Sequence, residues 1–177
     1  LNDSDGHYSG AVGIYFGGKA DMNLSFPDVR ISDSSNDNYG QYISGGGDID
    51  ADGYDDVVYF RANTAWILWG GDTITGTDTI GTNQTVNYPG AIELVQDFNG
   101  DGFDDIVVND FYSSAYVIFG MYDFDGSYDF AEVPDPLQSG YKYRDSVASV
   151  GDFNLDGYGD FVIGVFDDSS GGSADYE

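Results

Sequence analysis

The chain has 177 residues, the length of one ordinary domain or a short stack of repeats. It carries 29 Asp and 3 Glu against 2 Lys and 3 Arg, and the resulting formal net charge of -27 disfavours nucleic acid and anionic membrane surfaces as partners. Because Cys is absent and His7 is the only His, the sequence excludes disulfides, Cys/His zinc sites and thiol nucleophiles, while 41% hydrophobic and 16% aromatic residues are typical of a folded chain.

The predicted elements are all short strands, and most of them recur. Ala11 to Phe16 is an apolar run closed by glycines, and Met22 to Phe26 is a candidate for the strand after it. From residue 40 onward a longer unit repeats: an alternating run, an Asp-rich segment leading into an apolar run, a third apolar run closed by Gly, and a candidate fourth strand. The alternating runs are 41–46, 91–95 and 146–150, the Asp-rich segments 47–60, 96–109 and 151–164, the third runs 64–71 and 114–120, and the fourth-strand candidates 84–88 and 128–133.

This pattern predicts an all-β fold of propeller-type blades, each of four antiparallel strands, because no helical period is sustained over about a dozen residues. We expect one domain over 1–177. Residues 1–39 form the second half of a blade, 40–89 and 90–139 form two blades, and 140–177 form the first half of another. The turn-rich stretches 32–38, 71–83 and 167–173 are expected to be loops.

Three repeats are fewer than the roughly four blades of the smallest usual closed propeller. Unpaired strand edges invite pairing with another chain. We therefore expect an incomplete propeller whose two half-blades complete one another. That can happen between subunits of a head-to-tail filament, or because the chain is a slice of a longer repeat protein.

The Asp-rich segments share the pattern D-x-[DN]-x-D-G-x-x-D, with their leading aspartates 49 and 55 residues apart. Calcium takes six to eight oxygen ligands, and alternate side chains on a tightly turning loop can converge on one ion while Gly permits the bend. The expected ligands are Asp48, Asp50, Asp52, the Tyr54 carbonyl and Asp56; Asp97, Asn99, Asp101, the Phe103 carbonyl and Asp105; and Asp152, Asn154, Asp156, the Tyr158 carbonyl and Asp160. Three calcium ions, each with two positive charges, would change the formal charge from -27 to -21.

Two other kinds of acidic site are weighed against these loops. An EF-hand needs flanking helices and a Glu at its twelfth position, where this chain has Tyr59, Val108 and Ile163, so a calcium loop inside a β-hairpin fits better. Further acidic groups lack an acid at the first position and are expected to be solvated turns; they are Asp123, Asp125 and Asp129, and Asp3 and Asp5.

The segment GDFNLDGYGDFVIG and its two sisters, the closing motifs YFGG, LWGG and IFG, and Tyr39-Gly40 before a first strand resemble the FG-GAP repeats of integrin α-subunit propellers and of many secreted bacterial proteins. The resemblance covers nearly the whole chain. It implies that each Asp-rich loop joins the first two strands of a blade and binds calcium.

Two classes of function remain in competition. The first is a non-enzymatic, calcium-stiffened module for adhesion or assembly at the cell surface or outside the cell, where millimolar calcium suits loops of modest affinity. The second is part of a secreted calcium-dependent enzyme acting on polysaccharide, for which the non-carboxylate candidates, none in a recognisable motif, are His7, Lys19, Arg30, Arg61, Lys142 and Arg144. Protein partners or self-association are expected, and glycans are possible at the sequons of Asn2, Asn23 and Asn83.

Overall fold

A computed structural model describes residues 10–18, 24–32, 40–61, 64–72, 77–80, 89–110, 115–123, 130–133 and 146–164. Within these ranges all regular structure is β, which confirms the all-β prediction, and none of these residues forms a helix of the length and apolarity that a membrane span needs. The strands are β1 (Val12–Ile14), β2 (Val29–Ile31), β3 (Ile43–Gly47), β4 (Asp56–Arg61), β5 (Thr64–Leu68), β6 (Thr77–Ile80), β7 (Pro89–Val95), β8 (Asp105–Asp110), β9 (Ala115–Ile118), β10 (Phe130–Val133), β11 (Ser146–Gly151) and β12 (Asp160–Gly164).

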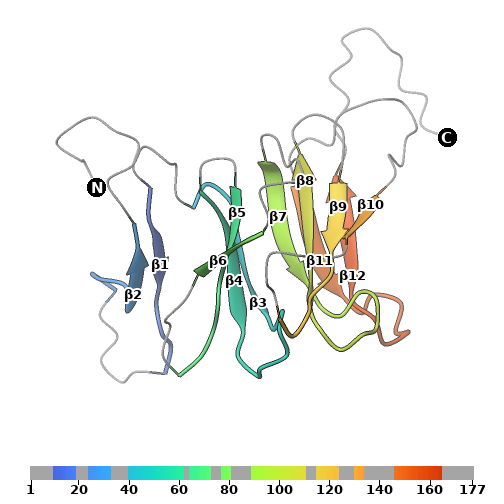
Figure 1. Ribbon diagram of the computed structural model, residues 1–177, viewed down its shortest axis with the longest axis horizontal. Coiled ribbons are helices and arrows are strands. Elements are labelled where there is room, and N and C mark those ends of the chain that lie inside the picture. Colours follow the sequence, from blue (N-terminus) through green and yellow to red (C-terminus); the bar gives the residue numbers. More distant parts are fainter. Residues whose placement is uncertain are drawn as a thin grey trace, which may run out of the picture.

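The strands form four antiparallel sheets that follow one another in chain order (Figure 1). Two sheets have four strands, in the orders β3-β4-β5-β6 and β7-β8-β9-β10. Two have two strands among the described residues, β1-β2 and β11-β12. Every pairing is between strands consecutive in the chain, so each sheet is a meander like a propeller blade.

The sheets stack face to face, with one apolar cluster between each pair of neighbours. Alternating side chains of β4 and β5 divide between the clusters on the two faces of their sheet, as the two-residue period of a strand requires. Val58 and Ile67 pack toward β7–β10, whereas Tyr59 and Leu68 pack toward β1 and β2. A third cluster, which includes Val107 and Val147, joins the β7–β10 sheet to β11 and β12.

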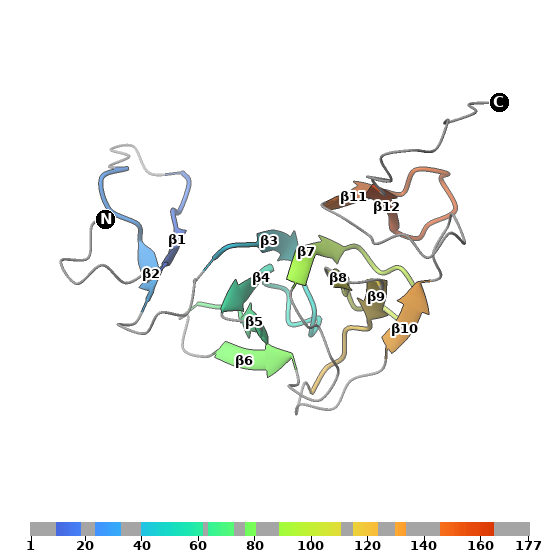
Figure 2. The ribbon, with the colours of Figure 1, turned by 90° about the horizontal axis from the view of Figure 1, so that it is seen from above.

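The first strands of successive sheets lie beside one another, as they do around the axis of a propeller (Figure 2). Hydrogen bonds cross between them: Leu94 N donates to Ser44 Oγ at 3.0 Å, and Ser149 N donates to Glu93 Oε1 at 3.4 Å. The described sheets thus form an arc of propeller-type blades rather than a closed barrel.

Two expected fourth strands lie elsewhere than predicted. Residues 24–26 of the Met22 to Phe26 candidate form a turn, and the strand is Val29–Ile31, after Pro27. Because Pro lacks an N–H and restricts the residue before it, pairing begins only beyond it, where Asp28 N donates to Ile14 O at 2.8 Å. In the next sheet the fourth strand is Thr77–Ile80, inside the stretch expected to be a loop, whereas the 84–88 candidate lies outside the described residues. The 128–133 candidate agrees with β10.

The glycine that ends the third strand is required by a close approach between backbones. A Cβ on Gly70 would collide with the carbonyl oxygen of Asp55, and one on Gly120 would collide with that of Asp104. The closing Gly therefore brings the end of the third strand against the Asp-rich loop of its own blade.

Candidate metal centre

Each Asp-rich loop connects the first strand of a sheet to the second, and all three loops lie at the same edge of the stack (Figure 1). We call residues 48–56 the first loop, 97–105 the second and 152–160 the third. Their backbones turn alike, with positive φ at the fourth and sixth positions. The values are 56° and 94° at Ala51 and Gly53, 79° and 94° at Gly100 and Gly102, and 63° and 94° at Leu155 and Gly157. Gly at the sixth position thus serves a backbone conformation that other residues rarely adopt.

Side-chain oxygens within each loop accept hydrogen bonds from the loop's own N–H groups. The first-position carboxylate accepts from the N–H of the sixth-position Gly at 2.9, 3.2 and 2.9 Å in the three loops. The third-position side chain accepts from the fifth N–H, and the fifth-position carboxylate from the seventh. Three acidic or amide side chains are thereby fixed over one short turn.

The ninth-position carboxylates of the first two loops are buried and tie the loop to the rest of its blade. Asp56 is 1% exposed and Asp105 is fully buried. Asp56 accepts from Ile49 N and Gly70 N, both at 2.8 Å, and Asp105 accepts from Phe98 N at 2.7 Å and Gly120 N at 3.0 Å. In the third loop the half-buried Asp160 accepts from Phe153 N at 2.9 Å.

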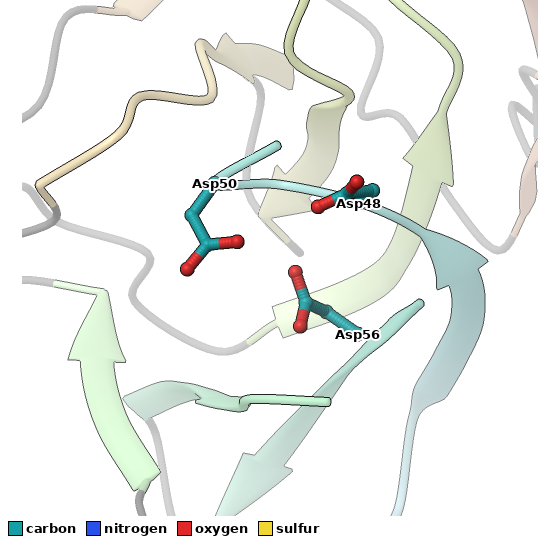
Figure 3. A group of neighbouring side chains, drawn as sticks. All are labelled: Asp48, Asp50 and Asp56. Atoms are coloured by element: carbon teal, nitrogen blue, oxygen red, sulfur yellow. The ribbon is translucent and has the colours of Figure 1, made fainter. Parts of the chain in front are cut away.

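Three carboxylates converge in the first loop. Asp48, Asp50 and Asp56 each offer an oxygen, and these oxygens all lie within 4.8 Å of one another (Figure 3). The set consists of oxygen donors alone, which suits a hard cation such as calcium. The carboxylate of Asp52, also expected as a ligand, is not part of this group; its Oδ1 accepts from Tyr54 N at 2.9 Å.

The burial and mutual repulsion of these carboxylates appear in their pKa values. Burial raises the pKa of Asp56 from 3.8 to about 6, assisted by the charges of Asp50 and Asp48 and opposed by the bonds from Gly70 and Ile49. Burial also raises the pKa of Asp50, with the charges of Asp52 and Asp48 acting in the same direction. A cation among these oxygens would offset both effects, because a neighbouring positive charge favours the ionised form.

The second and third loops gather fewer carboxylates. Asn99 and Asn154 occupy the third position, so at the first, third and ninth positions these loops offer two carboxylates where the first loop offers three. Within the described ranges no second group of three acidic side chains comes together as Asp48, Asp50 and Asp56 do. In the second loop, however, the buried Oδ1 of Asp97 has no hydrogen-bond partner, and burial raises the pKa of Asp105 to about 6. An oxygen left without a donor fits a loop built to bind a cation.

All fifteen expected ligand residues lie on these three loops, within the described residues. The sequence pattern did not identify Asp104, whose carboxylate bonds to two loops, nor the donor role of Gly70 and Gly120. The only signal for the glycines was their recurrence at the end of the third strand. Other predicted features lie outside the described residues: Asn2, Asp3, Asp5, His7, Lys19, Asn23, Asn83, Asp125, Asp129, Lys142 and Arg144.

No family model matches this chain. The chain is 34% identical to integrin alpha-PS5 of Drosophila melanogaster over 89 residues, which cover 46% of this chain and 9% of that protein. The chain thus spans a small part of the length of the curated relative that it matches. In sequence it is similar to part of an integrin α-subunit, the class of protein whose repeats the three loops resemble.

Proposed function

We propose that this chain is a calcium-binding repeat module of the FG-GAP type. It acts outside the cell or at its surface in adhesion or assembly, without catalysis. The observation that carries the proposal is the convergence of Asp48, Asp50 and Asp56 in the first of three loops that share one backbone turn. The likeness to part of an integrin α-subunit supports the same class of function.

Calcium in these loops would act on the structure. Each loop joins the first two strands of its sheet, and in the first two blades its ninth-position carboxylate also accepts a hydrogen bond from the Gly just after the third strand. An ion held by the first, third and ninth positions would therefore connect three strands and neutralise carboxylates that otherwise repel one another. The Asp-rich loops in this view stiffen blades rather than activate a substrate.

Arg61, one of the two basic residues in the described ranges, is used in packing, which favours a non-enzymatic role. The Arg61 guanidinium lies 5.2 Å from the centroid of the Trp66 ring, and Trp66 packs with the cluster between the first two sheets. Such a cation–π contact uses the guanidinium in packing. Arg30 lies on β2, paired with Gly13.

Calcium stoichiometry tests the proposal directly. Equilibrium dialysis of the whole chain is expected to give three bound ions with dissociation constants of about 0.1 to 1 mM. Asp48→Asn removes the first-position carboxylate, which all three loops carry, and should weaken one of the three sites strongly. Asp123→Asn removes the same charge at an exposed position outside the loops and should leave the stoichiometry at three. Binding of no calcium, or an equal effect of both variants, would contradict the proposal.

We also propose that the two-stranded sheets pair with each other between copies of the chain. β1 corresponds to a third strand and β2 to a fourth, while β11 and β12 correspond to a first and a second. By position, Gly17 matches Gly70 and Gly120, whose N–H groups donate to ninth-position carboxylates. Gly17 is exposed, and a Cβ on it would meet no atom within 4 Å. Its N–H would donate to Asp160 of a second copy, placing β1 beside β12.

Self-association is therefore expected to depend on Gly17. Gly17→Val has room within one chain but would collide with the loop backbone of a second copy, just as a side chain on Gly70 would collide within its own blade. Sedimentation velocity with calcium present should give a mean mass that rises with concentration for the natural sequence and stays near 19.1 kDa for Gly17→Val. A monomer at all concentrations, or equal association of both chains, would rule out this pairing.

A further inference from the structure

One carboxylate outside the calcium motif bonds to two of the loops at once. Asp104 Oδ1 accepts from the N–H of Asp97 at 3.0 Å, within the second loop. Asp104 Oδ2 accepts from the N–H of Asp48 at 2.9 Å, in the preceding blade. Asp48 and Asp97 are the first-position residues of their loops, so a single side chain holds the starting residue of both.

The backbone around Asp104 strengthens this link between blades. Asp104 N donates to Asp48 O at 3.1 Å, so the two residues exchange hydrogen bonds in both directions. Met121 N, which follows the third strand of the second blade, donates to Ile49 O at 3.0 Å. The first loop is thus held against the second blade by three hydrogen bonds beside its candidate ligands.

A glycine before the first loop makes room for the Asp104 side chain. A Cβ on Gly47 would lie 3.1 Å from Asp104 Oδ2 and 3.3 Å from Asp104 Cβ, closer than side chains normally pack. At the junction between the second and third loops, the large and the small residue exchange places. Gln96 stands in the place of Gly47 and Gly159 in the place of Asp104, and a Cβ on Gly159 would collide with the carbonyl oxygen of Gln96. There the backbone hydrogen bond between the loops is a longer one, from Gly159 N to Asp97 O at 3.4 Å, and the Tyr158 ring packs against Gly100 without a shared carboxylate.

We propose that Asp104 is a positioning residue that couples calcium binding in the first and second loops, while the third loop binds independently. The inference rests on the proposed calcium function. The Asp104 carboxylate holds the N–H of the first-position residue in place, so calcium binding has less of the loop to order. Preorganisation of this kind raises the affinity of the loop for calcium. Since both first-position residues share one carboxylate, ordering of either loop by calcium favours the ordered form of the other, and such coupling is reciprocal.

Each loop contains a glycine amide group whose NMR signal reports calcium binding in that loop. The amide groups of Gly53, Gly102 and Gly157 donate to the first-position carboxylates of their loops, so their NMR signals follow calcium binding loop by loop. We would titrate the whole chain with calcium and compare three variants. Asp104→Asn replaces one acceptor oxygen by an NH₂ group, and Gly47→Ala keeps the charge but displaces the carboxylate. Asp55→Asn is the matched control, because Asp55 holds the same eighth position in the first loop and is exposed.

Asp104→Asn and Gly47→Ala are each expected to raise the calcium midpoints of Gly53 and Gly102 by about fivefold and to leave that of Gly157 unchanged. Asp55→Asn should raise the Gly53 midpoint by less, and it should raise the Gly102 midpoint only through the coupling, by less still. If charge alone mattered, Asp55→Asn would weaken the first loop more than Asp104→Asn does, and Gly47→Ala would have no effect; that result overturns the coupling. A natural chain whose three glycine signals all ignore calcium would instead contradict the proposed calcium function.

Discussion

Removal of calcium is expected to lower the melting temperature of this chain by about 8 °C or more. With dissociation constants of about 0.1 to 1 mM, 10 mM calcium is a ten- to hundredfold excess that stabilises the folded state by about 1.4 to 2.7 kcal/mol per site, so three sites contribute about 4 to 8 kcal/mol. For a chain of this size each kcal/mol shifts the melting temperature by about 2 to 4 °C. The carboxylates that calcium leaves behind, Asp50 and Asp56 among them, then repel one another across the first loop.

Differential scanning calorimetry in 10 mM calcium and in excess chelator measures this shift. Magnesium at the same ionic strength is the control, because it requires a more rigid octahedral shell and should restore only a small part of the stability. Asp48→Asn, which removes a first-position carboxylate common to all three loops, should reduce the calcium-dependent shift by about a third if the three sites contribute equally. An unchanged melting temperature on chelation would contradict a stabilising role for the loops.

The loops could be predicted from the sequence because their constraints are local. The spacing of Asp48, Asp50 and Asp56 and the Gly at the sixth position are requirements of one short turn, and the turn occurs as expected in all three loops. The strands on either side were also predictable, because alternating apolar residues there serve the two faces of a buried sheet. The all-β blade architecture follows from these two local patterns.

The fourth strands were harder to predict because their sequences carry little of the apolar signal. Thr77–Ile80 contains one aliphatic residue and lies in a stretch rich in Thr, Gly and Asp, which is typical of loops. It is a strand because β5 offers it an edge, with Ala65 opposite Ile80 and Leu68 opposite Thr77. Pairing with a neighbour, rather than propensity, decides an outer strand of this kind.

Contacts between repeats could not be predicted either, because the motif describes each repeat separately. Position eight of the loop is Asp55, Asp104 and Gly159 in turn, so an alignment of the three segments shows no constraint on this position. The constraint lies in the pairing of this position with the residue before the preceding loop, Gly47 or Gln96. Side chains must fit across the junction, which only the packed blades reveal.

Two buried carboxyls, Asp56 and Asp105, are expected to give the chain opposite pH dependences with and without calcium. Both have a folded pKa of about 6 against a usual value of 3.8. The calcium-free folded state therefore holds these protons more tightly than the unfolded state does. Its free energy of unfolding falls as pH rises from about 4 to about 6, and the stabilisation by protonation is complete only below about 4.

Between pH 7 and pH 5 each of these carboxyls should stabilise the calcium-free chain by about 1 kcal/mol, or about 2 kcal/mol together. With saturating calcium the sign reverses, because a proton on Asp56 or Asp105 competes with the ion for the same oxygens. Urea unfolding at pH 5 and pH 7, in chelator and in calcium, measures both slopes.

Asp56→Asn provides the control: it cannot titrate, so it should remove about half of the calcium-free slope. It should also destabilise the chain at both pH values by about 1 to 3 kcal/mol, because its NH₂ group cannot accept from Ile49 N or Gly70 N as a carboxylate oxygen does. Stability that falls on acidification in chelator would show that Asp56 and Asp105 are ionised without cost in the empty loops, and that calcium is not needed to keep their charges buried.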